Sequence, residues 1–134
     1  MKLLLDTHIL LWAACAPHKL HPKARTLIED EQNELFYSPA SLWEILIKNR
    51  LGRSDFQVDP RIFRTALEDH GYRQIPITSE HVLFVHDLPL LHKDPLDRIL
   101  VAQASIEGMG LLTMDQAVMD YGGTVILDDD EKED

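Results

Sequence analysis

The sequence predicts an α/β fold, with a central parallel sheet of about four or five strands covered by helices on both faces. Short apolar runs alternate along the chain with longer segments whose apolar residues recur at helical spacing. Strands separated by helices pair in parallel, because each helix carries the chain back to the start of the sheet. No internal repeat or linker divides the 134 residues, a length that suits one domain with a single core.

The first half of the chain supplies two of these strands. Residues 2–5 form an apolar run, and the apolar residues of 9–13 follow it at helical spacing. Pro22 suits the first turn of a second helix, which we expect over residues 22–31. Residues 35–37, Leu-Phe-Tyr, then predict a second strand.

Three later helices begin with the same signal, a capping side chain followed by proline at the first helical position. The pairs are Ser38-Pro39, Asp59-Pro60 and Asp94-Pro95, and the expected ends lie at Gly52, Gly71 and Gly108. Between the second and third of these helices we expect a strand over residues 72–77 and a helix capped by Ser79.

The chain closes with a smaller unit. Residues 111–113 predict a buried strand, 116–121 a short helix and 124–127 a final strand, with a turn at Gly122-Gly123. We therefore expect one domain over residues 1–127. The acidic tail, residues 128–134, is expected to be disordered.

The charge distribution bears on possible partners. A net charge of −10 at first argues against nucleic acid, but the tail, with six acids and one lysine, carries half of it. Between residues 48 and 73, six basic side chains outnumber four acidic ones. That excess fits either a phosphate-binding flank or an ordinary solvated surface.

Compartment and redox chemistry are also constrained. A single cysteine, Cys15, allows no intramolecular disulfide, and its apolar neighbours favour a small buried side chain. The longest apolar run, residues 9–16, is too short to cross a bilayer, and Asp6 and His8 interrupt a start that otherwise resembles a signal peptide. We expect a cytoplasmic protein without a membrane segment.

Four carboxylates stand where the predicted strands give way to helices: Asp6, Glu44, Asp97 and Asp115. In a parallel sheet these positions gather at the carboxyl edge, where such folds bind ligands. Four anions in a small volume are unfavourable unless a divalent cation neutralises them. Because oxygen ligands favour Mg²⁺ or Mn²⁺ over Zn²⁺, the pattern predicts a site for one of these ions.

Each acid also has an ordinary structural explanation. An aspartate that precedes a helix can cap its first turn, which applies to Asp6, Asp94 and Asp115. Asp97, three residues after Asp94, has the spacing of the second acid in reciprocal helix capping. Glu44 can pair with Lys48 one turn later or close a capping box with Ser41.

Other catalytic signatures are absent from the sequence. The seven histidines contain no HExxH pair, and neither a serine nucleophile elbow nor a glycine-rich phosphate loop is present. These absences argue against a zinc hydrolase, a serine hydrolase and a nucleoside triphosphatase.

Four segments in order resemble the PIN-domain family, specifically the VapC-type toxins of toxin-antitoxin modules. They are Leu4-Leu5-Asp6-Thr7, Ser41-Leu42-Trp43-Glu44-Ile45, the run from His92-x-Asp94-Pro95-x-Asp97-Arg98 to Ala104, and Thr113-x-Asp115. The resemblance covers nearly the whole chain, from Met1 to Leu127. Leu96 stands where relatives often have phenylalanine, a change that leaves the acids untouched.

The resemblance implies a three-layer α/β/α PIN-like fold and a metal-dependent endoribonuclease that hydrolyses RNA phosphodiester bonds as a toxin. The implied catalytic and metal-binding residues are Asp6, Glu44, Asp97 and Asp115, with Asp94 as a further metal ligand and Mg²⁺ or Mn²⁺ as the cofactor. Thr7 and Ser41 would orient the carboxylates, and Arg98 would contact phosphate or brace Asp94.

Similar toxins pair with a cognate antitoxin and commonly form homodimers. Trp12, Phe63 and the apolar loop 88–91 could supply such a surface, although an ordinary core explains the two aromatic residues equally well. Two other functions stay open. One is an inert PIN-like binding module that uses its acids only electrostatically. The other is an aspartate-dependent phosphohydrolase, whose pattern needs a second acid where His8 stands.

Overall fold

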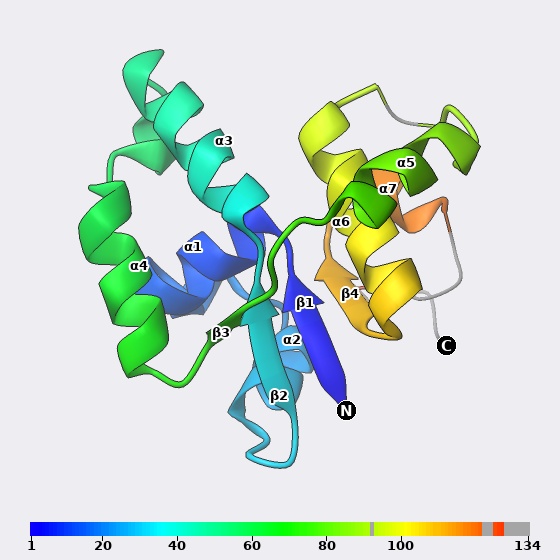
Figure 1. Ribbon diagram of the computed structural model, residues 1–134. Coiled ribbons are helices and arrows are strands. Elements are labelled where there is room, and N and C mark those ends of the chain that lie inside the picture. The colour runs from blue at the N-terminus through cyan, green and yellow to red at the C-terminus, as the bar shows by residue number, and fades with distance from the viewer. Residues whose placement is uncertain (92, 122–124, 128–134) are drawn as a thin grey trace.

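The computed structural model describes residues 1–91, 93–121 and 125–127 of the chain (Figure 1). The elements in order are β1 (Lys2–Leu5), α1 (Thr7–Cys15), a 3₁₀ turn (Pro17–Lys19), α2 (Pro22–Glu29), β2 (Glu34–Tyr37), α3 (Pro39–Arg50), a second 3₁₀ turn (Ser54–Phe56), α4 (Pro60–Asp69), β3 (Arg73–Gln74), α5 (Ser79–Asp87), α6 (Pro95–Glu107), β4 (Gly110–Thr113), α7 (Gln116–Met119) and β5 (Val125–Leu127). The expected turn at Gly122-Gly123 and the tail 128–134 lie outside the described residues.

The five strands form one parallel sheet in the order β3-β2-β1-β4-β5. The first strand therefore lies at the centre, with Leu4 opposite Phe36 of β2 and Leu5 opposite Leu112 of β4. Because parallel neighbours must be joined by crossovers, this order places helices on both faces of the sheet. The expected α/β fold with a central parallel sheet is confirmed.

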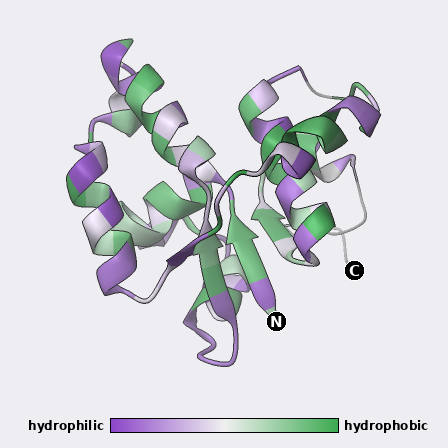
Figure 2. Ribbon diagram, viewed as in Figure 1, coloured by the Kyte–Doolittle hydropathy of each residue, from purple (hydrophilic) through white to green (hydrophobic). Residues whose placement is uncertain are grey.

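Alternate residues of β1 anchor the two halves of the core. Leu3 and Leu5 pack with residues of α1, α2 and α4, whereas Leu4 packs with residues of α6. Figure 1 shows the corresponding layers, with α1 and α4 on one side of the sheet and α5 and α6 on the other. Figure 2 shows that the central strands are hydrophobic over most of their length, as expected for strands buried on both faces.

The third strand is shorter than its sequence predicts. A strand was expected over residues 72–77, but β3 pairs with β2 only at Arg73 and Gln74. Pro76 has no N–H to donate to a ladder. Instead, the side-chain amide of buried Gln103 on α6 donates to the main-chain oxygens of Ile75 and Pro76, at 3.2 and 3.3 Å.

The cap of α5 also differs from the prediction. Thr78, not Ser79, caps the helix: its hydroxyl accepts from the N–H of His81, and Nδ1 of His81 accepts from the N–H of Thr78. Nε2 of the same buried ring lies 2.9 Å from Glu107 at the end of α6. The imidazole of His81 therefore takes the place of the glutamate in a standard capping box, and its contact with Glu107 links α5 to α6.

Two smaller expectations were wrong. Cys15, expected to be buried, is exposed at the last position of α1. The polar composition of residues 53–58 predicts a simple connection between α3 and α4, but this stretch contains the 3₁₀ turn whose Phe56 is fully buried in the core. Among the described residues, no helix is both long and apolar enough to cross a membrane.

Leu5→Ala should destabilise the protein strongly, because Leu5 is fully buried and its truncation leaves a cavity between β1 and α1. We expect a loss of about 2–5 kcal/mol in the free energy of unfolding, measured by urea denaturation. The matched control is Leu51→Ala, at a leucine that is 70% exposed, where the change should stay within about 0.5 kcal/mol. Equal effects of the two substitutions would contradict the assignment of β1 to the core.

Candidate functional site

Asp6 stands at the carboxyl edge of the sheet, directly after the central strand. Its N–H still donates to the main-chain oxygen of Leu112 in β4, at 3.1 Å. Its Oδ1 accepts from the N–H of Ile9, at 3.0 Å, and so caps α1. Its Oδ2 accepts a hydrogen bond from the hydroxyl of Thr113 at the end of β4. Both carboxylate oxygens are therefore held, and the side chain is fixed in place.

Burial makes the charge of Asp6 costly. The residue is only 7% exposed, and loss of hydration raises the pKa of its carboxyl from an ordinary 3.8 to about 6. The hydrogen bonds from Thr113 and Ile9 oppose this rise, and the negative charge of Glu44 adds to it. At neutral pH Asp6 is thus an anion that a nearby cation would stabilise.

Glu44 reaches the same place from α3. The helix buries one face, which includes Ser41 and Glu44, and the Oε2 atom of Glu44 lies 2.6 Å from Nζ of Lys48. The ion pair that the spacing allowed is therefore present. Thr7, at the start of α1, donates to the hydroxyl of Ser41 at 3.0 Å, and both residues are buried. This hydrogen bond fixes α1 against α3 beside the two carboxylates.

The remaining acids come from the start of two later helices. Asp94 caps α6 by accepting from the N–H of Leu96, at 2.9 Å, and Asp97 lies in the first turn of that helix. Asp115 caps α7 by accepting from the N–H of Ala117, also at 2.9 Å. The positive ends of α1 and α6 thus face acidic side chains, an arrangement that helix dipoles favour.

All five predicted acids line one cavity of about 170 Å³. Its lining residues are Asp6, Thr7, His8, Glu44, Lys48, Asp94, Asp97, Met114 and Asp115. Within the described part of the chain, no three His, Cys, Asp or Glu side chains already stand in a metal-chelating group. The donor set fits a hard divalent cation, because it consists of carboxylate oxygens with a single lysine against five acids. Binding such an ion requires some of these carboxylates to turn toward it.

Three lining residues were not predicted as part of the site: Met114 and the basic residues His8 and Lys48. His8 lies at the wall of the cavity, where its Nε2 is 3.1 Å from Asp55 and lowers the pKa of that carboxyl. Its ring lies near those of Trp12 and Phe56. Lys48 was predicted only as a partner of Glu44. The sequence signal for His8 is its position two residues after Asp6. The signal for Lys48 is its position one helical turn after Glu44.

Arg98 has a structural task. Its guanidinium donates to the main-chain oxygens of Val85 and Leu88, at 3.0 and 3.1 Å, and so joins α6 to the end of α5. A contact between Arg98 and phosphate stays a prediction, as does a contact with Asp94.

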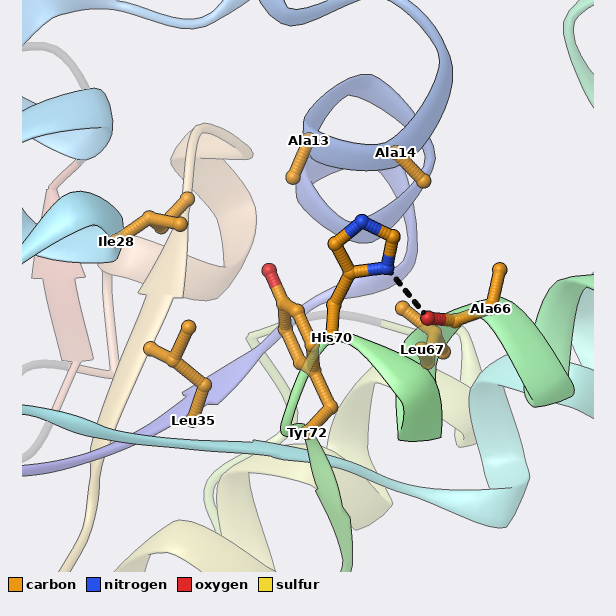
Figure 3. Close-up of a pocket in the computed structure, with 8 residues that line it drawn as sticks. All are labelled: Ala13, Ala14, Ile28, Leu35, Ala66, Leu67, His70 and Tyr72. Carbon is orange, nitrogen blue, oxygen red and sulfur yellow. Dashed lines mark hydrogen bonds between the residues drawn. The ribbon is translucent and has the colours of Figure 1, made fainter. Parts of the chain in front are cut away.

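A second cavity, of about 260 Å³, lies among α1, α2, β2 and α4 (Figure 3). No carboxylate is among its lining residues, which are Ala13, Ala14, Ile28, Leu35, Ala66, Leu67, His70 and Tyr72. The hydroxyl of Tyr72 points into it, and Nδ1 of His70 is held by the main-chain oxygen of Ala66 at 2.8 Å. This lining lacks the carboxylate oxygens that Mg²⁺ or Mn²⁺ prefers, so the acidic cavity is the candidate site.

Comparison with known proteins identifies the family. The PIN domain model matches residues 3–123, and the chain belongs to the PIN domain family. No sequence among the curated proteins matches it significantly. The family predicted from the four acidic segments is thus confirmed.

Solved structures share this fold at low sequence identity. The crystal structure of VapBC2 from Rickettsia felis, bound to a promoter DNA fragment, is 16% identical with a TM-score of 0.67 and covers 95% of this chain and 97% of that one. Mycobacterium tuberculosis VapC20, a toxin that cleaves the sarcin-ricin loop, is 15% identical with a TM-score of 0.66. The match covers 90% of this chain and 95% of that one. A chain of a toxin-antitoxin complex from Klebsiella pneumoniae is 19% identical with a TM-score of 0.59. The match covers 93% of this chain and 96% of that one.

Asp6→Asn should stabilise the metal-free protein at neutral pH. A folded-state pKa about two above the ordinary value means that Asp6 opposes folding increasingly as the pH rises from about 4 to about 6, by up to roughly 3 kcal/mol. Asparagine carries no charge and still caps a helix. In chelator at about pH 7.5, urea denaturation should show a more stable variant, and the difference should vanish near pH 4.

Asp59→Asn is the control for this experiment. Asp59 caps α4 at an exposed position, so its substitution reports the capping effect alone. A gain for Asp6→Asn that does not depend on pH would contradict a buried, costly charge.

Proposed function

We propose that the chain is a metal-dependent endoribonuclease that hydrolyses RNA phosphodiester bonds and serves as the toxin of a toxin-antitoxin pair. The observation that carries this proposal is the convergence of five acids on one cavity at the carboxyl edge of a PIN-domain sheet. Likeness in fold to VapC20, a toxin that cleaves the sarcin-ricin loop, supports RNA as the substrate. We place the activity in the cytoplasm, where such a substrate is available.

Asp6, Glu44, Asp97 and Asp115 would hold Mg²⁺ or Mn²⁺, with Asp94 as a further ligand. When bound, the ion lowers the pKa of a water molecule and stabilises negative charge on the leaving oxygen of the cleaved bond. The chain's own contribution is orientation. Thr113 and the N–H of Ile9 hold Asp6, and the hydrogen bond between Thr7 and Ser41 keeps α1 and α3 at a fixed distance.

A purified sample should cleave structured RNA, such as an oligonucleotide of the sarcin-ricin loop, only when Mg²⁺ or Mn²⁺ is present. Asp6→Asn and Asp97→Asn should each lower the rate by roughly 10²-fold or more, because each removes a charged ligand from the site. Gel analysis of end-labelled RNA measures the loss. Asp69→Asn, at an exposed acid near the end of α4, is the control and should cleave at the unchanged rate. Cleavage that persists in excess chelator would overturn the proposal.

An inert binding module is the second candidate, and two observations favour it. Lys48 already neutralises Glu44, and the described acids do not form a ready-made chelating group. Calorimetric titration with Mn²⁺ separates the two functions. Saturable binding supports the nuclease, whereas its absence at neutral pH supports the inert module.

The proposed partners are a cognate antitoxin and a second copy of the chain. A basic side chain of the antitoxin would complement the five acids of the cavity. The homodimer surface that we propose is an apolar groove next to it, lined by Ala40, Trp43, Ile47, Lys48, Ile77, Val82, Val85, Asp94, Pro95, Leu96 and Ile99. Lys48 and Asp94 line both, so dimers formed here would bring two acidic cavities near one another.

The aromatic residue at this groove is not one that the sequence singled out. Phe63 is buried at 4% exposure and half-buried Trp12 packs on the core, so a dimer surface on Phe63 is wrong. Trp43, by contrast, is 61% exposed in the groove. Large exposed aromatic side chains are the residues that anchor protein interfaces most often.

Trp43→Glu should dissociate the dimer, because it places a charge where an apolar anchor would be buried. We expect the dissociation constant to rise about 30-fold or more, which corresponds to an anchor worth about 2 kcal/mol. Analytical ultracentrifugation measures it, and circular dichroism checks the fold. Leu51→Glu, which adds the same charge at an exposed leucine outside the groove, should leave the mass unchanged. A wild-type chain that stays monomeric at high concentration would exclude this dimer.

A further inference from the structure

Lys48 gives the acidic cavity a positive charge of its own. One turn of α3 places Nζ of Lys48 2.6 Å from Oε2 of Glu44. The carboxylate is 6% exposed and the lysine side chain 24% exposed, so the pair is largely withdrawn from water. The ammonium also lies 5.0 Å from the centre of the buried Phe56 ring, which favours a cation at this position.

The lining of the cavity makes this charge significant. Five of the nine lining residues are acids, and Lys48 is the one lysine or arginine among them. His8, the remaining basic residue of the lining, is paired with Asp55, which is not part of the wall. The buried carboxylate of Glu44 is thus already paired with a cation, the ammonium of Lys48.

We propose that Lys48 is a built-in counter-ion that occupies Glu44 in the metal-free protein and competes with the divalent ion for that carboxylate. This inference rests on the proposed function of the same site. It makes Lys48 a regulatory residue with two opposing effects. The ammonium stabilises the metal-free fold, because a buried anion without a partner is strongly unfavourable. It also weakens metal binding, because the ion must first displace it.

The geometry allows the displacement. Lysine carries a compact ammonium on a flexible four-carbon chain, so rotation of that chain moves the charge without moving α3. Lys48 lines the neighbouring apolar groove as well as the acidic cavity, and its side chain is partly exposed. The stem can therefore rest against the groove while the ammonium moves to water.

The test compares the wild type with Lys48→Met, which keeps the length of the side chain and removes its charge. Titration calorimetry with MnCl₂, without RNA, should show at least 10-fold tighter binding in the variant. Thermal unfolding in chelator should show a lower midpoint for Lys48→Met, and saturating Mn²⁺ should raise that midpoint by more than it raises the midpoint of the wild type. A structural ion pair without competition predicts the lower midpoint but no gain in affinity.

Three further variants sharpen the result. Lys48→Arg keeps the charge and should keep the weak affinity. Arg50→Met removes an exposed charge from the same helix and should change the affinity less than 2-fold. In a Glu44→Gln background the effect of Lys48→Met should largely disappear, because the contested carboxylate is gone. Should Lys48→Met fail to fold in chelator, the variant purified in Mn²⁺ can be titrated with a competing chelator.

The outcomes separate this inference from the proposed function. If the wild type binds Mn²⁺ and Lys48→Met binds it equally or more weakly, the competition is refuted and the nuclease proposal stands. If Lys48→Met binds Mn²⁺ and the wild type does not, the competition is supported in its strongest form. If neither protein binds the ion, the metal-dependent function itself is wrong.

Discussion

The structure depends on one electrostatic constraint, the gathering of buried negative charge at the carboxyl edge of a parallel sheet. Asp6 stands at the centre of this edge because β1 is the central strand, and little water reaches it. A carboxylate in that position must receive hydrogen bonds or a nearby cation, or it takes up a proton. Asp6 receives hydrogen bonds from the hydroxyl of Thr113 and from the N–H of Ile9 at the start of α1. The neighbouring carboxylate of Glu44 is paired with the ammonium of Lys48.

The capping and functional explanations of the acids are compatible. Asp6, Asp94 and Asp115 each accept a hydrogen bond from the first turn of a helix, and each still lines the acidic cavity. A helix start supplies N–H groups and a favourable dipole, so it lowers the cost of holding an anion there. Capping thus helps to hold the acids together at one site. An aspartate that caps a helix can therefore also line that site.

The acidic cavity and the apolar groove are neighbours that share two residues, Lys48 and Asp94. A change at either pocket that moves Lys48 or Asp94 would therefore alter the other pocket as well. A partner bound over the groove would exclude water from the rim of the acidic cavity. The interactions between charges in the cavity would then be stronger. The proposed partner binding and the proposed metal binding would thus be linked by position, whichever partner covers the groove.

Local signals in the sequence determined where most elements begin. The cap-and-proline pairs before α3, α4 and α6 are complete within two residues, and the apolar runs of β1 and β4 are equally local. Asp6, Asp94, Asp97 and Asp115 were predictable for the same reason, because each caps a helix or lies in its first turn. Glu44 lies in the middle of α3, away from the strand-to-helix boundary that the sequence predicted for it. All five predicted acids line the acidic cavity, and the PIN domain model matches residues 3–123.

Only the tertiary structure decided the features that depend on residues distant in sequence. Gln103 of α6 takes the carbonyl groups that would have extended β3, and the ring of His81 both caps α5 and reaches Glu107. Cys15 and Trp43 are exposed because each lies on a side of its helix that is not packed against the rest of the protein. The sequence by itself thus determined elements and chemistry, since those arise from neighbours along the chain. Burial and the balance of charge in the cavity required the packed fold, since they depend on which distant surfaces meet.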